Sequence, residues 1–317
     1  MGRPKTNYLF GLDLGNGNLK IVGNAFEQRI PSIHIPAPEA EALGNITING
    51  KSYIVGHGAQ QSLSAIPTVE DKSLKVEGIE RLYYGGLSYV PQLSSKIQSY
   101  PVVSSHAWAT HKEEIKANLN GTKTVVLAGK TVEVTTRCLL VVPEGFGAIV
   151  ERSEKLIATL DFGTGTTLIT PYINKKPMRS TQAQNGGVHN LYLMISEGMN
   201  KVNFGYRGDV REIRKSLELG VLKVGDVEIK ETYNEQLKKW WNDCLKDVRL
   251  EAERLHKDGY TILCIGGGAA LPGLASMLKR KKFEVVTDKP ELASARGLYQ
   301  LAIKEAKKNG ISTVEAE

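Results

Sequence analysis

The chain has 317 residues, of which 41% are hydrophobic, and this length is enough for two domains of ordinary size. It contains no apolar run close to the roughly 20 residues that span a bilayer, and Asp13 interrupts the first apolar stretch, so neither a membrane span nor a signal peptide is expected. Three cysteines without metal-ligand spacing imply no disulfide framework, and a net charge of +7 permits attraction to nucleic acid without specifying it. We therefore expect a cytoplasmic protein that does not associate with a membrane.

The first predicted element is a β-hairpin around a glycine-containing stretch. Residues 12–20 read Leu-Asp-Leu-Gly-Asn-Gly-Asn-Leu-Lys, and short apolar runs lie on both sides, at 8–12 and 19–22. Such runs around a glycine turn indicate a hairpin. Asp13 is therefore expected at the end of a buried strand, directly before the turn.

The rest of the first half is predicted to be mostly extended. The three prolines of residues 31–38 exclude a helix there, and Asn49-Gly50 predicts a tight primed turn in a hairpin over 46–56. Residues 57–99 are predicted to be mixed, 102–103 a short strand, 111–119 a helix and 123–136 a further hairpin.

A carboxylate follows the last strand of this half. Residues 138–142 are predicted as a buried strand that Pro143 ends, and 146–155 as a helix leading into the second half. Glu144 then lies at a strand end beside a domain boundary. If two glycine turns face one another, this carboxylate would orient a water molecule; a surface-loop glutamate is the alternative, and the sequence alone favours that alternative.

The second half opens by repeating the first stretch. Residues 160–168 read Leu-Asp-Phe-Gly-Thr-Gly-Thr-Thr-Leu, again between short apolar runs. One glycine turn of this kind is often an ordinary hairpin turn in which aspartate serves the turn, but the repetition argues against that reading. Two such hairpins half a chain apart predict two related domains that face each other.

The paired turns suit a polyphosphate and a metal ion. A buried carboxylate is costly unless a cation neutralises it, and no basic residue adjoins Asp161 in the sequence, so a hydrated Mg²⁺ held by Asp13 and Asp161 is a natural candidate. Glycines let the backbone approach a ligand, and successive N–H groups form an anion-binding nest. The candidate phosphate-binding residues are Gly15, Asn16, Gly17, Asn18, Lys20, Gly163, Thr164, Gly165 and Thr166.

Further glycines precede predicted helices in the second half. Gly186 and Gly187 come before a helix over 189–200, which suits the approach of a phosphate or ribose, although a turn or packing role is at least as well supported. A strand over 260–265 runs into Gly266, Gly267 and Gly268, where the backbone would again lie close to a flat or anionic ligand.

The remaining elements of this half read as core and surface. Helices are predicted over 209–219, 232–257 and 292–308, with short strands at 227–229 and 285–286; the apolar stripe of 232–257 indicates core packing. The basic run 279–282 is typical of a solvated helix end, so direct DNA binding is possible but less favoured. Strands alternate with helices in each half, which predicts an α/β architecture.

Three blocks in order, 13–20, 161–167 and 265–269, resemble the first phosphate loop, second phosphate loop and adenosine motif of the actin, heat-shock-chaperone and sugar-kinase superfamily. Within it, the sequence is most similar to bacterial actin-like proteins of the ParM/StbA plasmid-segregation type. The hairpin at 49–56, Val142-Pro143-Glu144 and the segment 295–299 carry that similarity. Leu168-Ile169-Thr170 departs from it, because relatives often place another acid after the second loop.

The resemblance implies an α/β actin-like fold with two ribonuclease-H-like domains around a nucleotide cleft, residues 1–145 with 293–317 forming domain I and 146–292 domain II. It implies an ATPase that polymerises with ATP (or GTP) and Mg²⁺ bound and depolymerises after hydrolysis. Asp13 and Asp161 would arrange the magnesium and its waters, and Glu144 would position the attacking water. The partners it implies are further copies of the chain, in a filament, and a DNA-binding adaptor that links the filament to a plasmid.

Other functions of the superfamily fit the sequence less well. A sugar-kinase-type phosphotransferase, the main alternative, needs a general base near a bound hydroxyl, and no acid is clearly suited to that role. A chaperone would need a substrate-binding domain after residue 317, and a shape-determining actin of the MreB kind would need an amphipathic membrane segment.

Overall fold

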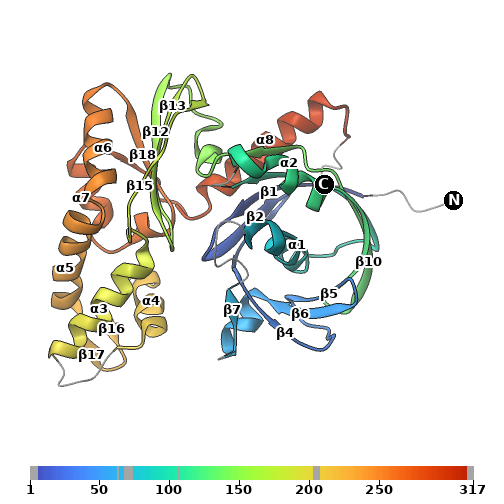
Figure 1. Cartoon of the computed structure of the whole chain (residues 1–317), viewed down its shortest axis with the longest axis horizontal. Helices are drawn as coiled ribbons and strands as arrows, with labels where there is room; N and C mark the ends of the chain where they lie inside the picture. The colour runs from blue at the N-terminus through green and yellow to red at the C-terminus, as the bar shows by residue number, and fades with distance from the viewer. Residues whose placement is uncertain (1–5, 63, 68–73, 106–107, 203–207, 313–317) are drawn as a thin grey trace. The chain divides into compact units, whose positions relative to one another are not determined.

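The structure is a computed structural model that describes residues 6–62, 64–67, 74–105, 108–202 and 208–312. The chain divides into two compact units, Met1–Glu151 with Ser294–Glu317 and Arg152–Ala293 (Figure 1). The assignment of two actin-like domains that divide at 145/146 and 292/293 stays a prediction.

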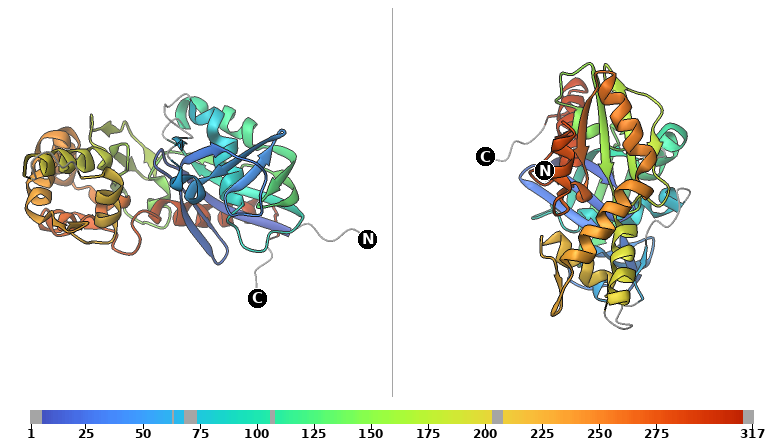
Figure 2. Two further views of the ribbon diagram at one scale, coloured as in Figure 1. Left: turned by 90° about the horizontal axis from the view of Figure 1, so that it is seen from below. Right: turned by 90° about the vertical axis from the view of Figure 1, so that its left-hand side faces the viewer.

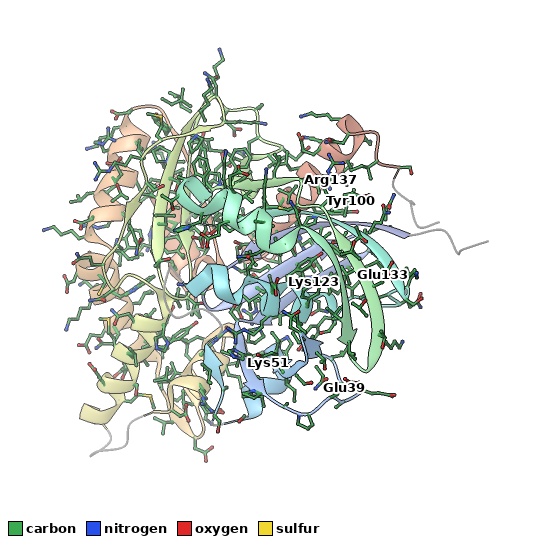
Figure 3. All side chains as sticks on the ribbon, turned by 45° about the vertical axis from the view of Figure 1, so that its right-hand side comes forward. Glu39, Lys51, Tyr100, Lys123, Glu133 and Arg137 are labelled. Carbon is green, nitrogen blue, oxygen red and sulfur yellow. The ribbon has the colours of Figure 1, made fainter. Side chains whose placement is uncertain are left out.

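The first unit is built on a single sheet. Its strand order is β3-β2-β1-β8-β10-β9-β5-β6-β4-β7, and β11 also pairs with β8. Strands β9 and β10 alternate buried and more exposed residues, and polar side chains such as Lys123 on β9 and Glu133 on β10 project from them (Figure 3). The strands are β1 (Thr6–Leu14), β2 (Asn18–Gly23), β3 (Phe26–Pro31), β4 (Ile33–Pro36), β5 (Asn45–Ile48), β6 (Lys51–Val55), β7 (Ile66–Pro67), β8 (Lys96–Ser104), β9 (Gly121–Leu127), β10 (Lys130–Thr136) and β11 (Leu140–Val142).

Helices cover both faces of this sheet. Strand β1 contributes to both contacts because its successive side chains point to opposite faces. Phe10 and Leu12 belong to the cluster that contains residues of α1 (Leu74–Leu87) and α2 (Trp108–Leu119). Leu9, on the other face, packs with α8 (Ala293–Lys308). Gly11 lies on the α8 face, where a Cβ would come within 2.2 Å of the Ala295 carbonyl oxygen, so only glycine permits this approach.

The second unit is a smaller sheet with helices. Its strand order is β14-β13-β12-β18-β19, with β15 also on β13 and a separate ribbon of β16 and β17. The strands are β12 (Leu156–Phe162), β13 (Thr167–Ile173), β14 (Lys176–Pro177), β15 (Thr181–Gln182), β16 (Lys223–Val224), β17 (Val227–Glu228), β18 (Thr261–Ile265) and β19 (Glu284–Val285). The helices are α3 (Val188–Val202), α4 (Val210–Glu218), α5 (Lys230–Lys239), α6 (Lys246–Lys257) and α7 (Leu274–Arg280).

The two units share one strand arrangement. In the first, the antiparallel hairpin β1–β2 pairs through β1 with the parallel strand β8; in the second, the hairpin β12–β13 pairs through β12 with the parallel strand β18. Both repeated glycine stretches therefore form hairpins whose first strand is central in its sheet, as the sequence predicts.

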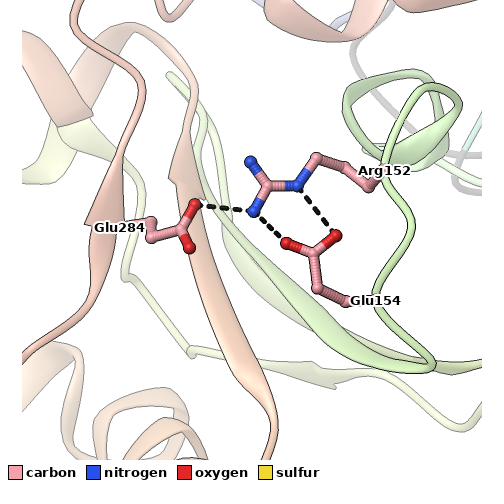
Figure 4. Close-up of polar contacts among 3 residues, drawn as sticks. All are labelled: Arg152, Glu154 and Glu284. Carbon is pink, nitrogen blue, oxygen red and sulfur yellow. Dashed lines mark hydrogen bonds and ion pairs between the residues drawn. The ribbon is translucent and has the colours of Figure 1, made fainter.

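The predicted helix over 146–155 is wrong. Only a single 3₁₀ turn forms, Phe146–Ile149, in which Gly147 lies against α8, where a Cβ would be 1.9 Å from the Ser294 carbonyl oxygen. The polar residues that follow carry no apolar stripe. Instead, Arg152 bonds to Glu154 and to Glu284 of β19 within the second unit (Figure 4).

Three other predicted elements change in extent. The predicted helix over 232–257 is two helices, α5 and α6, separated by a π-helical turn, Trp240–Cys244; the right-hand view of Figure 2 shows them following one another in orange. The short strand at 102–103 is part of the nine-residue β8, and the strand predicted over 138–142 is reduced to Leu140–Val142. Among the described helices, none is both long and apolar enough to cross a bilayer.

Candidate functional site

The turn of the first hairpin, Gly15 to Asn18, is held from the β3–β4 junction. The Ser32 hydroxyl donates to the Gly15 carbonyl oxygen at 2.7 Å, and the Ser32 N–H donates to the Gly17 carbonyl oxygen at 3.2 Å. Asn16 at the tip is exposed. The turn therefore has a fixed backbone and an open tip, the arrangement that an anion-binding loop needs.

Asp13 is buried at the end of β1 and paired within the unit. Its side chain is 4% exposed, its Oδ2 lies 2.8 Å from Lys20 Nζ, and the Ser104 hydroxyl donates to its Oδ1 at 2.8 Å. Strand register explains both contacts, because Lys20 stands opposite Asp13 on β2 and Ser104 opposite it on β8. Lys20, predicted as a phosphate contact, is thus a partner of Asp13 in this structure.

Asp161 occupies the same position in the second hairpin but has different strand neighbours. Leu168 stands opposite it on β13 and Ile265 on β18. Lys20 of the first hairpin therefore corresponds to Leu168 in the second. The register supplies a cation at Asp13 and apolar side chains at Asp161.

The second turn, Gly163 to Thr166, packs directly on Gly186 and Gly187. The Val188 and His189 N–H groups at the start of α3 donate to the carbonyl oxygens of Gly163 (3.0 Å) and Thr164 (2.9 Å). A Cβ on Gly187 would lie 2.5 Å from the Gly165 carbonyl oxygen. Two glycine segments separated in sequence therefore form one cradle.

The third glycine segment completes this cradle. Gly266 has a φ of +86°, and a Cβ there would lie 2.2 Å from Asp161 Oδ1, while a Cβ on Gly268 would lie 2.7 Å from Phe162 Cβ. The exposed Gly267 differs from both, since a Cβ there would meet nothing nearer than Glu291 Cβ at 3.9 Å. Protein packing thus explains Gly266 and Gly268, and leaves the side of Gly267 open to a ligand.

Glu144 follows the end of a strand on the same sheet edge as Asp13. Strand β8 pairs in parallel with both β1 and β11, and Ser104 stands opposite Asp13 on one side and Val142 on the other. Glu144 is partly exposed in the turn after Val142. The fold therefore brings Asp13 and Glu144 to one edge of the first unit, although they are distant in sequence.

Sequence reasoning missed Ser32 and Ser104, which hold the first turn and Asp13. Neither serine lies in a glycine motif, and only the strand register reveals them. The ranges described contain no group of three or more His, Cys, Asp or Glu side chains placed to hold a metal ion.

Known proteins share this organisation. Residues 11–147 match the family described as the N-terminal domain of actin-like proteins. Ta0583, an archaeal actin homologue, superposes with a TM-score of 0.79 at 19% identity, over 94% of this chain and 99% of that one. This chain has an actin-like fold.

Other solved structures share the actin-like fold. A ParM from a 15-stranded filament of Clostridium botulinum has a TM-score of 0.70 at 20% identity, over 94% of this chain and 99% of that one. Bacillus thuringiensis ParM with ATP has a TM-score of 0.69 at 18% identity, over 96% and 100%. No curated protein sequence matches the chain. The predicted fold class and the predicted resemblance to ParM-type actin-like proteins are confirmed.

Proposed function

We propose that this protein is an ATPase whose polymerisation into cytoplasmic filaments depends on bound nucleotide, and that the filaments serve plasmid or DNA segregation. The fold is actin-like, and among its structural neighbours one was solved as a filament and another with ATP. The glycine cradle of the second unit is the observation that carries the proposal. Three separate segments leave an open backbone surface beside Asp161, and packing accounts for Gly163, Gly186, Gly187, Gly266 and Gly268 but not for Gly267.

In the proposed site, the two turns hold the phosphates. Backbone N–H groups and short polar side chains come from residues 15–18 and 163–166. The second turn is supported by the Gly186-Gly187 segment that packs against it. Gly266, Gly267 and Gly268 pass beside the nucleoside. These backbone contacts do not select between adenine and guanine.

Carboxylate oxygens are the protein ligands that Mg²⁺ prefers, usually one or two of them with several waters and the substrate phosphates. Asp13 and Asp161 fit that donor set. A bound Mg²⁺ would neutralise charge on the phosphates, and Glu144 would orient the attacking water. Positioning and charge neutralisation are most of what phosphoryl transfer requires.

We propose that each unit is one ribonuclease-H-like domain. The filament partner is a second copy of the chain, and a DNA-binding adaptor would connect the filament to its cargo. Direct DNA contact through residues 279–282 is the less favoured route, because this run closes helix α7, where cations complement the helix dipole.

The competing function is a sugar-kinase-type phosphotransferase. We expect ATP consumption that hexoses do not stimulate, together with nucleotide-dependent light scattering and pelleting. Hexose-dependent ATP consumption without a pellet would favour the kinase instead.

Replacing Asp161 tests the metal role. Asp161→Asn keeps the shape and removes the charge, so Mg-ATP affinity should fall about tenfold, while the metal-free nucleotide should be bound almost as before. Asp226→Asn, an exposed acid on the β16–β17 turn of the same unit, is the matched control and should bind like the wild type. Equal Mg-ATP affinity in Asp161→Asn and wild type would count against the proposed site.

A further inference from the structure

The π-helical turn between α5 and α6 contacts the candidate nucleotide cradle at several points. In it, the Leu245 N–H donates to the Trp240 carbonyl oxygen at 3.0 Å, five residues back, so this turn contains one residue more than an α-helical turn. Single π turns within helices often occur at functional sites. The contacts of this one show what it holds.

Trp240 packs beside the second turn, against Phe162. Its side chain is fully buried, and its ring lies 6.3 Å from the ring of Phe162, the residue between Asp161 and Gly163. Its indole Nε1 is buried without a hydrogen-bond partner among the described residues. A buried indole N–H without a hydrogen-bond partner lowers the stability of the folded protein. The packing of Trp240 against Phe162 is a reason for a tryptophan at this position in spite of that cost.

The next two contacts reach the Gly186-Gly187 turn. A Cβ on Gly186 would lie 2.9 Å from Leu245 Cδ2, so this leucine packs directly beneath the turn. Asn190, whose N–H donates to the Gly187 carbonyl oxygen at 3.0 Å, donates through its side chain to Cys244 Sγ at 3.5 Å. One short segment thus contacts both sides of the cradle.

The extra residue sets which side chains make these contacts. In the π turn the backbone hydrogen bond joins residues five apart, instead of four apart as in an α-helix. Leu245, and not Cys244, therefore follows Trp240 on the buried face, and Cys244 faces Asn190 of α3. An α-helical turn would place these two side chains differently. The π turn therefore fixes the spacing between the supports of Phe162 and of Gly186.

We propose that the π turn Trp240–Cys244 is a positioning element for nucleotide binding, with Trp240 in the turn and Leu245 directly after it as the positioning residues. The inference rests on the proposed function, because the cradle it supports is the proposed nucleotide site. It assigns no ligand contact to the π turn, which acts through Phe162 and Gly186.

Deleting the exposed Asn242 tests this directly. The deletion removes the one extra residue and returns the turn to α-helical hydrogen bonding, so that Leu245 follows Trp240 at the spacing of an α-helix instead of a π turn. We expect a folded protein with a thermal midpoint close to that of the wild type. Its affinity for a fluorescent ATP analogue should fall about tenfold, as when the outer-shell support of a binding site is removed.

A pair of tryptophan variants decides the question if the deletion variant does not fold. Trp240→Phe replaces the indole that contacts Phe162 with a smaller ring, whereas Trp241→Phe changes the adjacent buried tryptophan of the same turn. Weaker nucleotide binding by Trp240→Phe alone supports the proposal. Equal affinity in both variants and in the wild type overturns it.

A spectroscopic readout separates positioning from general stability. In a variant that retains only Trp240, made by Trp108→Phe and Trp241→Phe, nucleotide should change the tryptophan emission, and an unchanged emission contradicts the proposal. If the wild type itself binds no nucleotide, the proposed function fails. If it binds nucleotide and the deletion variant binds equally well, only the present inference fails.

Discussion

Lys20 and Asp13 form the most consequential pair at the scale of single residues. Removing one partner of a buried ion pair leaves the other charge uncompensated, at a typical cost of about 3 kcal/mol. Lys20→Met should therefore lower the free energy of unfolding by about that amount, measured by urea denaturation. Adding Asp13→Asn to Lys20→Met should recover part of the loss, and a double variant less stable than Lys20→Met would contradict the pairing.

The cradle glycines separate packing from ligand contact. Gly267→Ala should leave the thermal midpoint unchanged, because its Cβ would meet nothing nearer than 3.9 Å, yet it should weaken nucleotide binding by narrowing the open side of the cradle. Gly266→Ala should destabilise the protein by more than about 1 kcal/mol, because its φ is +86° and its Cβ would overlap Asp161. Undiminished nucleotide affinity in Gly267→Ala would remove this segment from the proposed site.

Glu144 is tested by its effect on turnover. Glu144→Gln should slow phosphate release about a hundredfold while nucleotide still binds, since the carboxylate is needed to orient water and not to hold the phosphates. Polymers of the variant should persist longer after ATP is added. Glu113→Gln, an exposed acid on α2 of the same unit, is the control, and equal hydrolysis by Glu144→Gln and this control would exclude Glu144 from the mechanism.

At the scale of elements, Arg152 connects the segment before β12 to β19. The Arg152 hydrogen bond holds the pKa of Glu154 below its ordinary value, so this pair adds stability above the usual carboxyl pKa of about 4.3 and loses it as the pH falls through the lower folded value. Both side chains are about a third exposed, so the effect is small and screened by salt.

Arg152→Ala tests this contribution through its pH dependence. The gap in urea midpoint between wild type and Arg152→Ala should be largest near neutral pH and smaller at acid pH, below the lowered folded pKa of Glu154, because protonation of Glu154 removes its ion pair with Arg152. A gap of the same size at both pH values would mean that Arg152 stabilises the unit through packing alone.

Sequence patterns predicted the elements whose signals are local. Both glycine hairpins, the Asn49-Gly50 turn and the amphipathic helix α8 form as expected, because turn chemistry and apolar periodicity act over a few residues. The helix expected over 146–155 is wrong: after the 3₁₀ turn the segment is held instead by Arg152, whose bond to Glu284 of β19 is a tertiary contact. The π turn gave no sequence signal, because the apolar pairs Trp240-Trp241 and Cys244-Leu245 keep helical spacing whichever member of each pair faces the core.

The same division holds for the candidate site: its local motifs could be predicted from the sequence, and the contacts between distant residues could not. The glycine segments and the carboxylates stand out by repetition and by their places at strand ends. Ser32, Ser104 and the Asp13–Lys20 pair follow instead from strand register, which brings together residues as far apart as Asp13 and Ser104. Register is set by the whole sheet and cannot be read from either segment alone.

At the scale of the whole molecule, the protein combines an actin-like fold with one proposed nucleotide site, to which both glycine turns contribute, and with proposed assembly between copies. Electron microscopy of the purified protein with Mg-ATP, with Mg-ADP and without nucleotide tests this most directly. We predict filaments with Mg-ATP that disappear as hydrolysis proceeds, and none without nucleotide. Single particles under all three conditions, in a preparation that binds Mg-ATP, would contradict the polymerising function.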